Sequence, residues 1–142
     1  MEYKRLFIVM LIVLAADQLS KILIRAFLPM GQKLWLIKPV LSFTHTTNTG
    51  AAFGLLKDGN LMLIWVSLIA FGLMLYYYDR FEEKMRIYVA LISGAILGNL
   101  ADRVFLGHVT DFIDFQMWPV FNIADSCLVI SVAMLVIYTL KN

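Results

Sequence analysis

Four long runs of apolar residues dominate this sequence and leave little chain for anything else. Each run is 18 to 20 residues long, and a helix of about 20 residues crosses the hydrocarbon core of a bilayer. A single segment crosses there only as a helix, because a helix satisfies its own backbone hydrogen bonds. The sequence therefore predicts an all-α membrane protein, a single integral membrane domain over residues 1–142. Its four transmembrane helices are expected at residues 6–24, 61–78, 87–105 and 121–140.

The composition excludes several other classes of protein. Hydrophobic residues make up 61% of the chain and charged residues 15%, whereas a soluble domain is about half apolar and about a quarter charged. The formal net charge is only +2, and no run of Lys or Arg exceeds two residues, so nucleic acid is not an expected partner. The single cysteine, Cys127, excludes an intrachain disulfide framework and a cysteine-rich metal site.

The first apolar run has a second interpretation, as a cleaved signal peptide that ends at Ala16. A retained helix is favoured, because the apolar character resumes at Ile22 and three further runs follow.

The density of basic residues predicts the orientation of the helices in the membrane. One side, residues 1–5, 79–86 and 141–142, holds six Lys or Arg in 15 positions. The other side, residues 25–60 and 103–120, holds five in 54. Both termini and the loop at 79–86 are therefore expected in the cytoplasm, and the larger loops on the extracytoplasmic side.

The only sizeable stretch outside the expected helices covers residues 31–58. Apolar and polar side chains alternate within it from Leu41 to Thr46, which is the periodicity of a strand. We therefore expect a small extracytoplasmic β element between the first and second helices.

Most of the polar residues that are unusual for a membrane segment fall at one depth. On the predicted topology they lie in the outer halves of the spans or in the outer loops, and no acidic residue lies in the inner half of a span. Ionisable groups in a membrane segment are costly and by default indicate a functional site. The set comprises Asp17, Lys21, Asn48, Asn99, Asp102, Arg103, His108, Asp111, Asp114, Asn122 and Asp125.

Several members of this set also have a purely structural interpretation. Asp17 and Lys21 are four residues apart on a helix, the spacing of an ion pair. Asp102 and Arg103 end the third run near the interface, where Arg can extend its head group into water.

Two further patterns have structural readings of the same kind. Asn122 and Asp125 have the spacing of a helix capping box. Gly94 and Gly98 form a G-x-x-x-G pattern, which in membranes is typical of close helix packing.

Three kinds of chemistry are compatible with such a site. A Ser–Lys protease would need Ser20 or Ser126 to meet Lys21. A lipid phosphotransferase would need carboxylates such as Asp111 and Asp114 around a divalent cation. His45 and His108 lack the clustered partners of a metal site, and no metal is expected.

The third possibility is a pair of aspartates that share a proton. One carboxylate takes a proton from water while the protonated one donates to the substrate carbonyl. Asp125 is favoured as one member, and Asp102, Asp111 and Asp114 compete for the other place. A non-enzymatic subunit is the rival from another class, but it does not explain the clustering at one depth.

Five motifs follow one another in the chain and together resemble a known family, lipoprotein signal peptidase, also called signal peptidase II, of bacteria. The resemblance covers essentially the whole chain and rests on residues 17–21 (DQLSK), 48–54 (NTGAAFG), 97–103 (LGNLADR), 107–114 (GHVTDFID) and 121–126 (FNIADS).

The resemblance implies a fold, an activity and a location. The family is a membrane aspartic endopeptidase with four transmembrane helices. It removes the signal peptide of prolipoproteins on the N-terminal side of a diacylglyceryl-modified cysteine. For this chain it implies the bacterial cytoplasmic (inner) membrane, an active site at the extracytoplasmic interface, a lipid-modified prolipoprotein and membrane lipids as partners, no cofactor, and activity as a monomer.

The resemblance also implies roles for individual residues. Asp111 and Asp125 would form the catalytic dyad. A second group would line the substrate site: Asn48, Asn99, Arg103 and Asn122. A third group would support the site: Asp17, Lys21, Asp102 and Gly50.

The chain departs from the family pattern at one place. Ala95 and Ile96 stand where the family commonly has glycine and alanine, which affects the packing of the third helix.

A further hypothesis concerns the roles of the two aspartates. Asp125 at a helix N-terminus is the more readily ionised aspartate, so Asp125 would act as base and Asp111 as acid.

Overall fold

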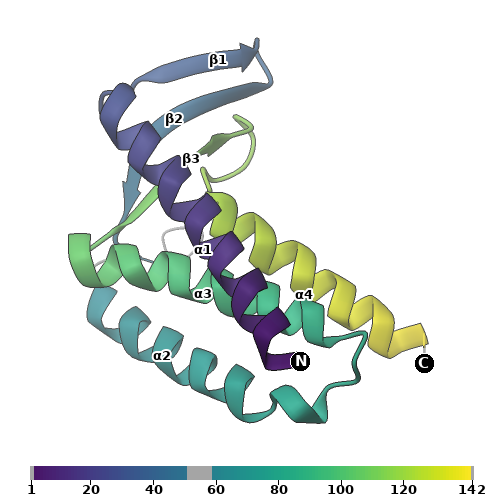
Figure 1. The fold of residues 1–142 in the computed structure, drawn as a ribbon. Helices are drawn as coiled ribbons and strands as arrows, with labels where there is room; N and C mark the ends of the chain where they lie inside the picture. The colour runs from purple at the N-terminus through teal and green to yellow at the C-terminus, as the bar shows by residue number, and fades with distance from the viewer. Residues whose placement is uncertain (1, 51–58, 142) are drawn as a thin grey trace.

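A computed structural model describes residues 2–50 and 59–141 of this chain (Figure 1). Four long helices form close to the predicted positions: α1 (Glu2–Phe27), α2 (Asn60–Tyr76), α3 (Arg86–Leu106) and α4 (Ile123–Lys141). By length and composition, α1, α3 and α4 can each cross a membrane. Helix α2 is apolar but has only 17 residues, so the fourth span stays a prediction.

The ends of the helices follow local chemistry. Helix α3 stops at Gly107, whose φ of 78° is left-handed and whose backbone N–H donates to the Arg103 carbonyl; glycine adopts this conformation without a steric penalty. Helix α2 ends earlier than predicted, because a short 3₁₀ helix, η2 (Tyr78–Arg80), begins the connection to α3.

The β structure is larger than predicted. Strands β1 (Lys33–Ile37) and β2 (Leu41–Asn48) lie between α1 and α2, as expected, but a third strand, β3 (Val109–Asp114), completes an antiparallel sheet in the order β1-β2-β3. The sequence interpretation treated residues 104–120 as a loop. It missed β3 because this short strand is stabilised by pairing with β2, more than 60 residues earlier, for example Thr46 with Asp111.

The bundle has two distinct ends (Figure 1). The sheet lies beyond the C-terminus of α1 and beside the beginning of α4, whereas both chain termini and η2 lie at the opposite end. Helix α3 contributes most of the buried helical positions, and α2 has no buried residue between Asn60 and Tyr76.

The crossing of α1 and α3 depends on two glycines. A Cβ atom on Gly94 would lie 2.8 Å from the Cβ of Val13, and one on Gly98 would lie 2.6 Å from Oδ2 of Asp17. The prediction that the G-x-x-x-G pattern packs two helices closely is therefore confirmed. This close contact places Asp17 and Lys21 of α1 in the interior beside α3.

Candidate active site

A groove with a volume of about 1210 Å³ lies at the sheet end of the bundle. Strands β2 and β3, the end of α3 and the beginning of α4 form its walls. Its polar lining includes five of the predicted site residues: Asn48, Asn99, Arg103, Asp111 and Asp125. Much of the remaining wall is apolar and comes from Val109, Ile113, Phe115, Trp118, Val120, Phe121, Leu128, Val129 and Ile130. The groove thus combines a small polar centre with a long apolar surface.

Asn122 connects the two carboxylates at this centre. Its side-chain Nδ2 donates to Oδ1 of Asp111 at 2.7 Å. Its side-chain Oδ1 accepts from the backbone N–H of Asp125 at 2.9 Å, and its own backbone N–H lies 3.4 Å from Oδ2 of Asp125. Asn122 is fully buried and does not itself line the groove, so it holds the two aspartates from behind.

The capping box predicted for Asn122 and Asp125 is therefore present. The reciprocal bonds between these residues satisfy N–H groups that a helix leaves unpaired at its first turn. Capping and the contact with Asp111 occur together, because the amide of Asn122 has a separate acceptor and donor. The sequence interpretation had treated capping and a site role as alternatives.

The Asp111 carboxyl, on β3 outside the helices, has an unusual protonation equilibrium. Burial raises its pKa most, and the nearby Asp125 carboxylate raises it further. Hydrogen bonds from Asn122 and Asn48 and the charge of Lys21 lower the pKa, but the balance leaves it at about 7. Asp111 therefore holds a proton over a pH range in which an ordinary carboxyl has lost it.

Asn99 joins the groove to a buried ionic cluster. Its Nδ2 donates to Oδ1 of Asp125 at 2.8 Å, and its Oδ1 accepts from Nζ of Lys21 at 3.0 Å. Lys21 in turn lies 2.8 Å from Asp17 and 3.3 Å from Asp102. The predicted ion pair of Asp17 and Lys21 is confirmed. Because Lys21 and Asp17 are fully buried, this cluster fixes the orientation of Asn99.

Asp17 has a second function in the fold. Its Oδ1 accepts from the backbone N–H of Ala124 at 3.0 Å, so a carboxylate of α1 caps the first turn of α4. Negative charge at this position is stabilising, because a helix N-terminus carries partial positive charge. The contact joins residues 107 positions apart and fixes the start of α4 beside the groove.

Asp102 is buried rather than exposed at the membrane interface, contrary to the structural reading of its position. Besides Lys21, it contacts Nη1 of Arg25 at 3.6 Å and accepts from the backbone N–H of Thr110 at 2.9 Å. Gln18 donates to its other oxygen at 3.2 Å. Asp102 does not line the groove. Arg25, Thr110 and Gln18 were not singled out from the sequence, although Gln18 directly follows Asp17.

Asp114 is also directed away from the groove. Asp111 and Asp114 are three residues apart on one strand, so their side chains leave opposite faces. Asp114 accepts from Lys33 at 2.9 Å and from Thr44 at 2.9 Å. Burial raises the pKa of Asp114, but these bonds and one from the backbone of Gln116 outweigh it and hold that pKa below its usual value. Of the three aspartates that competed to accompany Asp125, only Asp111 shares its groove.

Arg103 lies at the edge of the polar centre. Its Nη2 donates to the carbonyl of Gly50 at 3.2 Å, and the N–H of Gly50 donates to Asn48 Oδ1 at 3.0 Å. Asn48 Nδ2 donates to Asp111 at 3.2 Å. Within residues 2–50 and 59–141, the buried Nε of Arg103 has no hydrogen-bond partner. The rest of the 48–54 motif, residues 51–54, lies outside the described residues.

Both serines and His45, which were considered from the sequence, lie within hydrogen-bond distance of backbone carbonyls. Ser126 lines the groove and donates to the Asn122 carbonyl at 2.8 Å, and Ser20 donates to the Asp17 carbonyl at 2.7 Å. Neither serine forms a hydrogen bond with Lys21 in the described chain. His45 Nδ1 lies 2.7 Å from the Leu28 carbonyl. The described residues contain no group of three His, Cys, Asp or Glu side chains that could hold a metal ion.

Known proteins resemble this chain over most of its length. The profile of the signal peptidase (SPase) II family matches residues 9–141. The chain belongs to the signal peptidase II family. It is 40% identical over 134 residues to the lipoprotein signal peptidase of Halothermothrix orenii, covering 93% of this chain and 92% of that protein. It is 41% identical to the lipoprotein signal peptidase of Desulfitobacterium hafniense, covering 91% and 88%.

Solved structures are similar as well. A bacterial membrane enzyme superposes on this signal peptidase II family member with a TM-score of 0.92 at 30% identity, over 97% of this chain and 88% of that one. A second structure of a bacterial membrane enzyme gives a TM-score of 0.89 at 30% identity, over 98% and 94%. Membership of a peptidase family, together with several apolar helices, makes this chain a multi-pass membrane protease.

The five motifs of the signal peptidase II resemblance come from different elements: α1, β2, α3, β3 and the beginning of α4. The described parts of all five meet at the groove or at the ionic cluster behind it. The departure at Ala95 is accommodated by packing, since this buried residue contacts Val13 of α1 and Ala124 of α4 in one apolar cluster.

Proposed function

We propose that this protein is a membrane aspartic endopeptidase that removes the signal peptide of prolipoproteins on the N-terminal side of a diacylglyceryl-modified cysteine. Asp111 and Asp125 are proposed as the acid–base pair, with water as the nucleophile and no metal or other cofactor. The observation that carries this proposal is that both aspartates line one groove and are held by the same buried residue, Asn122.

The proton positions support a division of labour. Asp111, with a pKa raised to about 7, keeps a substantial protonated fraction near neutral pH and acts as the acid. Asp125 lies in the first turn of α4, where the helix dipole favours a carboxylate, and acts as the base. Two close carboxylates share one proton more readily than both ionise. The active form is therefore the pair that carries one proton.

Hydrolysis of the peptide bond then proceeds in two steps. Asp125 takes a proton from water as the water oxygen attacks the scissile carbonyl carbon, and Asp111 gives its proton to the carbonyl oxygen. In the second step the tetrahedral intermediate collapses as its hydroxyl returns a proton to Asp111. The C–N bond breaks, and Asp125 gives its proton to the amine of the lipid-modified cysteine. Both aspartates return to their initial states.

The surrounding side chains suit this substrate. Arg103 lines the groove, and its guanidinium is proposed as a donor for a carbonyl of the bound peptide. Asn48 and Asn99 orient Asp111 and Asp125 through their amides. The apolar wall along Leu128, Val129 and Ile130 offers a surface to a hydrophobic signal sequence and to acyl chains.

The placement in the membrane is part of the proposal. All four long helices cross the bilayer, both termini lie in the cytoplasm, and the groove lies at the extracytoplasmic interface. A site at that depth reaches the scissile bond while the diacylglyceryl chains stay in the bilayer. The protein acts as a monomer, since every residue of the proposed site comes from one chain.

The decisive experiment is cleavage of a lipid-modified prolipoprotein by purified protein, with the cut position read by mass spectrometry. Asp111→Asn is expected to abolish cleavage, because it removes the ionisable acid with almost no change in shape. Asp114→Asn is the matched control on the same strand, and it is expected to retain cleavage because Asp114 lies outside the groove.

The same assay separates the alternatives. A chelator is expected to leave the rate unchanged, whereas a cation-dependent lipid enzyme would lose activity. Substantial cleavage by folded Asp111→Asn would show that the pair is wrongly assigned. Absence of any cleavage by the unaltered protein would remove the peptidase proposal as a whole.

A further inference from the structure

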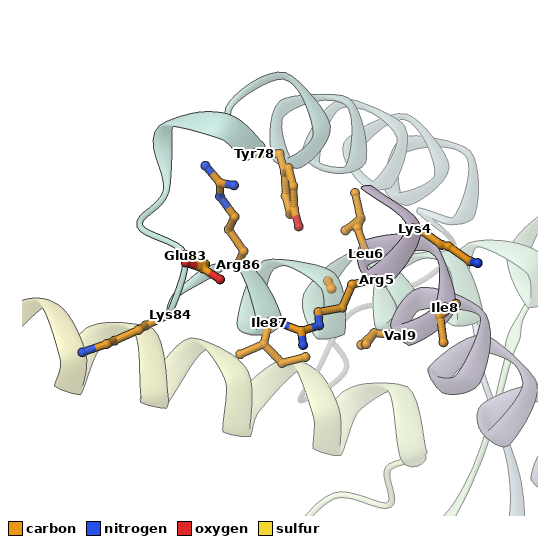
Figure 2. Close-up of a pocket in the computed structure, with 11 residues that line it drawn as sticks. Lys4, Arg5, Leu6, Ile8, Val9, Tyr78, Glu83, Lys84, Arg86 and Ile87 are labelled. Atoms are coloured by element: carbon orange, nitrogen blue, oxygen red, sulfur yellow. The ribbon is translucent and has the colours of Figure 1, made fainter. Parts of the chain in front are cut away.

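A second cavity, of about 990 Å³, lies at the end of the bundle opposite the groove. It is formed by the beginning of α1 and by η2 and the beginning of α3 (Figure 2). None of its lining residues lines the groove or belongs to the ionic cluster behind it. The cavity is therefore separate from the proposed site of peptide cleavage.

The lining of this cavity has two chemically different parts. Four basic residues and one acidic residue, Glu83, form its charged part, a formal charge of +3. Its apolar part extends along both helices. The basic members are Lys4, Arg5, Lys84 and Arg86, and the apolar members are Leu6, Ile8, Val9, Ile87 and Ala90.

Three of the basic side chains are available to a ligand. Lys4, Arg5 and Lys84 are exposed, and in the described part of the chain they make no hydrogen bond or ion pair through their side chains. Arg86 differs, because it donates to the Phe81 and Asp79 carbonyls at 3.0 and 3.2 Å. Arg86 therefore shapes the cavity, and the other three supply free positive charge.

The apolar part continues into the surface that faces lipid. Leu6 and Ala90 are buried at the floor, whereas Ile8 is 48% exposed and Ile87 is 39% exposed. A small anion would use only the basic rim of such a cavity. A molecule with a phosphate head group and acyl chains would use both parts, because its chains would lie along α1 and α3.

We propose that this cavity binds an acidic phospholipid, with its phosphate held by Lys4, Arg5 and Lys84 and its acyl chains between α1 and α3. Basic pockets between membrane helices recognise anionic head groups in this manner. The inference uses the membrane position of the bundle and the lining of this cavity, and it does not depend on the proposed peptidase activity.

The test is lipid titration of delipidated protein in an uncharged detergent, followed by the midpoint of thermal unfolding. Phosphatidylglycerol is expected to raise the midpoint at concentrations where phosphatidylcholine with the same acyl chains has no effect. Arg5→Gln and Lys84→Gln are each expected to weaken the apparent affinity roughly fivefold, since one basic residue contributes about 1 kcal/mol to binding an anionic lipid surface.

Matched variants distinguish the cavity from the general positive charge of this end. Lys141→Gln removes one exposed charge from the same end but outside the cavity, and it is expected to bind phosphatidylglycerol normally. The charge-retaining pair Arg5→Lys and Lys84→Arg is expected to preserve binding, which separates lost charge from misfolding.

Several results would overturn the inference. Equal stabilisation by both lipids would mean that no head group is recognised. An equal loss of phosphatidylglycerol affinity in Lys141→Gln would mean that the general positive charge of this end, and not the cavity, attracts the lipid. Glycerol phosphate without acyl chains that bound as tightly as phosphatidylglycerol would make the cavity a simple anion site.

Discussion

At the scale of single residues, Asn122 is the side chain on which most of the candidate site depends. It directly precedes α4, accepts from the N–H of Asp125, donates to Asp111 and also donates to Oδ1 of Asn99 at 3.1 Å. An N-cap residue normally serves only its own helix. Here the side-chain amide bonds both the Asp111 carboxyl and the backbone N–H of Asp125, and the backbone N–H of Asn122 lies near the Asp125 carboxylate.

This double use of Asn122 can be separated by mutation. Asn122→Ser retains an N-cap oxygen but loses the amide donor to Asp111, so stability close to that of the unaltered protein and a large loss of cleavage are expected. Asn122→Ala loses the cap as well and is expected to cost a further ~1 kcal/mol of stability. Thermal unfolding and the cleavage assay measure the two effects. Full activity in Asn122→Ser would contradict the proposed role of the amide.

The pH dependence of cleavage follows from the protonation of Asp111. Its pKa is raised from 3.8 to about 7, so the protonated form needed for acid catalysis is lost as pH rises through about 7. The rate is expected to fall about tenfold per pH unit above that point. Asp114→Asn is expected to give the same profile. A rate that stayed constant from pH 6 to 9 would argue against Asp111 as the acid.

At the scale of secondary-structure elements, the contact between α1 and α3 positions the ionic cluster. Gly98 lets Asp17 approach the α3 backbone, and Gln18 donates to the Gly98 carbonyl at 3.0 Å. The close crossing allows Asp17 to reach both Lys21 and the first turn of α4. The packing of α1 against α3 therefore also sets the geometry of the site.

Adding a methyl group at this crossing is expected to be costly. In Gly98→Ala the new Cβ would meet Oδ2 of Asp17 at 2.6 Å, and in Gly94→Ala it would meet Val13 Cβ at 2.8 Å. Overpacking of this kind costs about 1–3 kcal/mol, and Gly98→Ala should also reduce cleavage. Gly72→Ala in α2 is the matched control, since no atom lies within 4 Å of the added Cβ. Its thermal unfolding in detergent is expected at a higher midpoint than that of the unaltered protein.

If Gly98→Ala and Gly72→Ala unfolded at the same temperature, the close approach of α1 and α3 would not limit stability. A loss of cleavage without a loss of stability in Gly98→Ala would instead locate the effect in the displaced Asp17.

At the scale of the whole molecule, the bundle has two chemically different ends. The sheet end carries the groove, with its carboxylates and amides, and the other end carries the termini, η2 and a basic cavity (Figures 1 and 2). An asymmetry of basic residues orients membrane proteins, with the basic side in the cytoplasm. The two ends are thus expected on opposite sides of the bilayer.

This topology can be tested by labelling engineered cysteines in a Cys127→Ala background. Lys38→Cys, in the exposed connection between β1 and β2, is expected to react with an impermeant maleimide added to right-side-out membrane vesicles. Lys141→Cys is expected to react only after the membrane is permeabilised. Labelling of both positions from the same side would contradict an even number of spans.

Local sequence patterns were enough to predict the helices, the capping box, the ion pair of Asp17 and Lys21, and the residues that gather at one end. These features follow from local periodicity and from spacings of three or four residues, which the chain carries in its own order. The family resemblance named Asp111 and Asp125, whereas the residues alone left Asp102 and Asp114 as alternatives.

The division of those residues between the groove and the interior depends instead on long-range packing. Strand β3 exists because it pairs with β2, and that pairing points Asp111 and Asp114 to opposite faces. Ion pairs with Lys21 and Arg25 of α1 hold Asp102 away from the groove. Asp17 caps the start of α4 through Ala124, 107 residues away. Such contacts join segments distant in sequence, so their partners are set by the packing of α1 against α3 and by strand register, which no local pattern encodes.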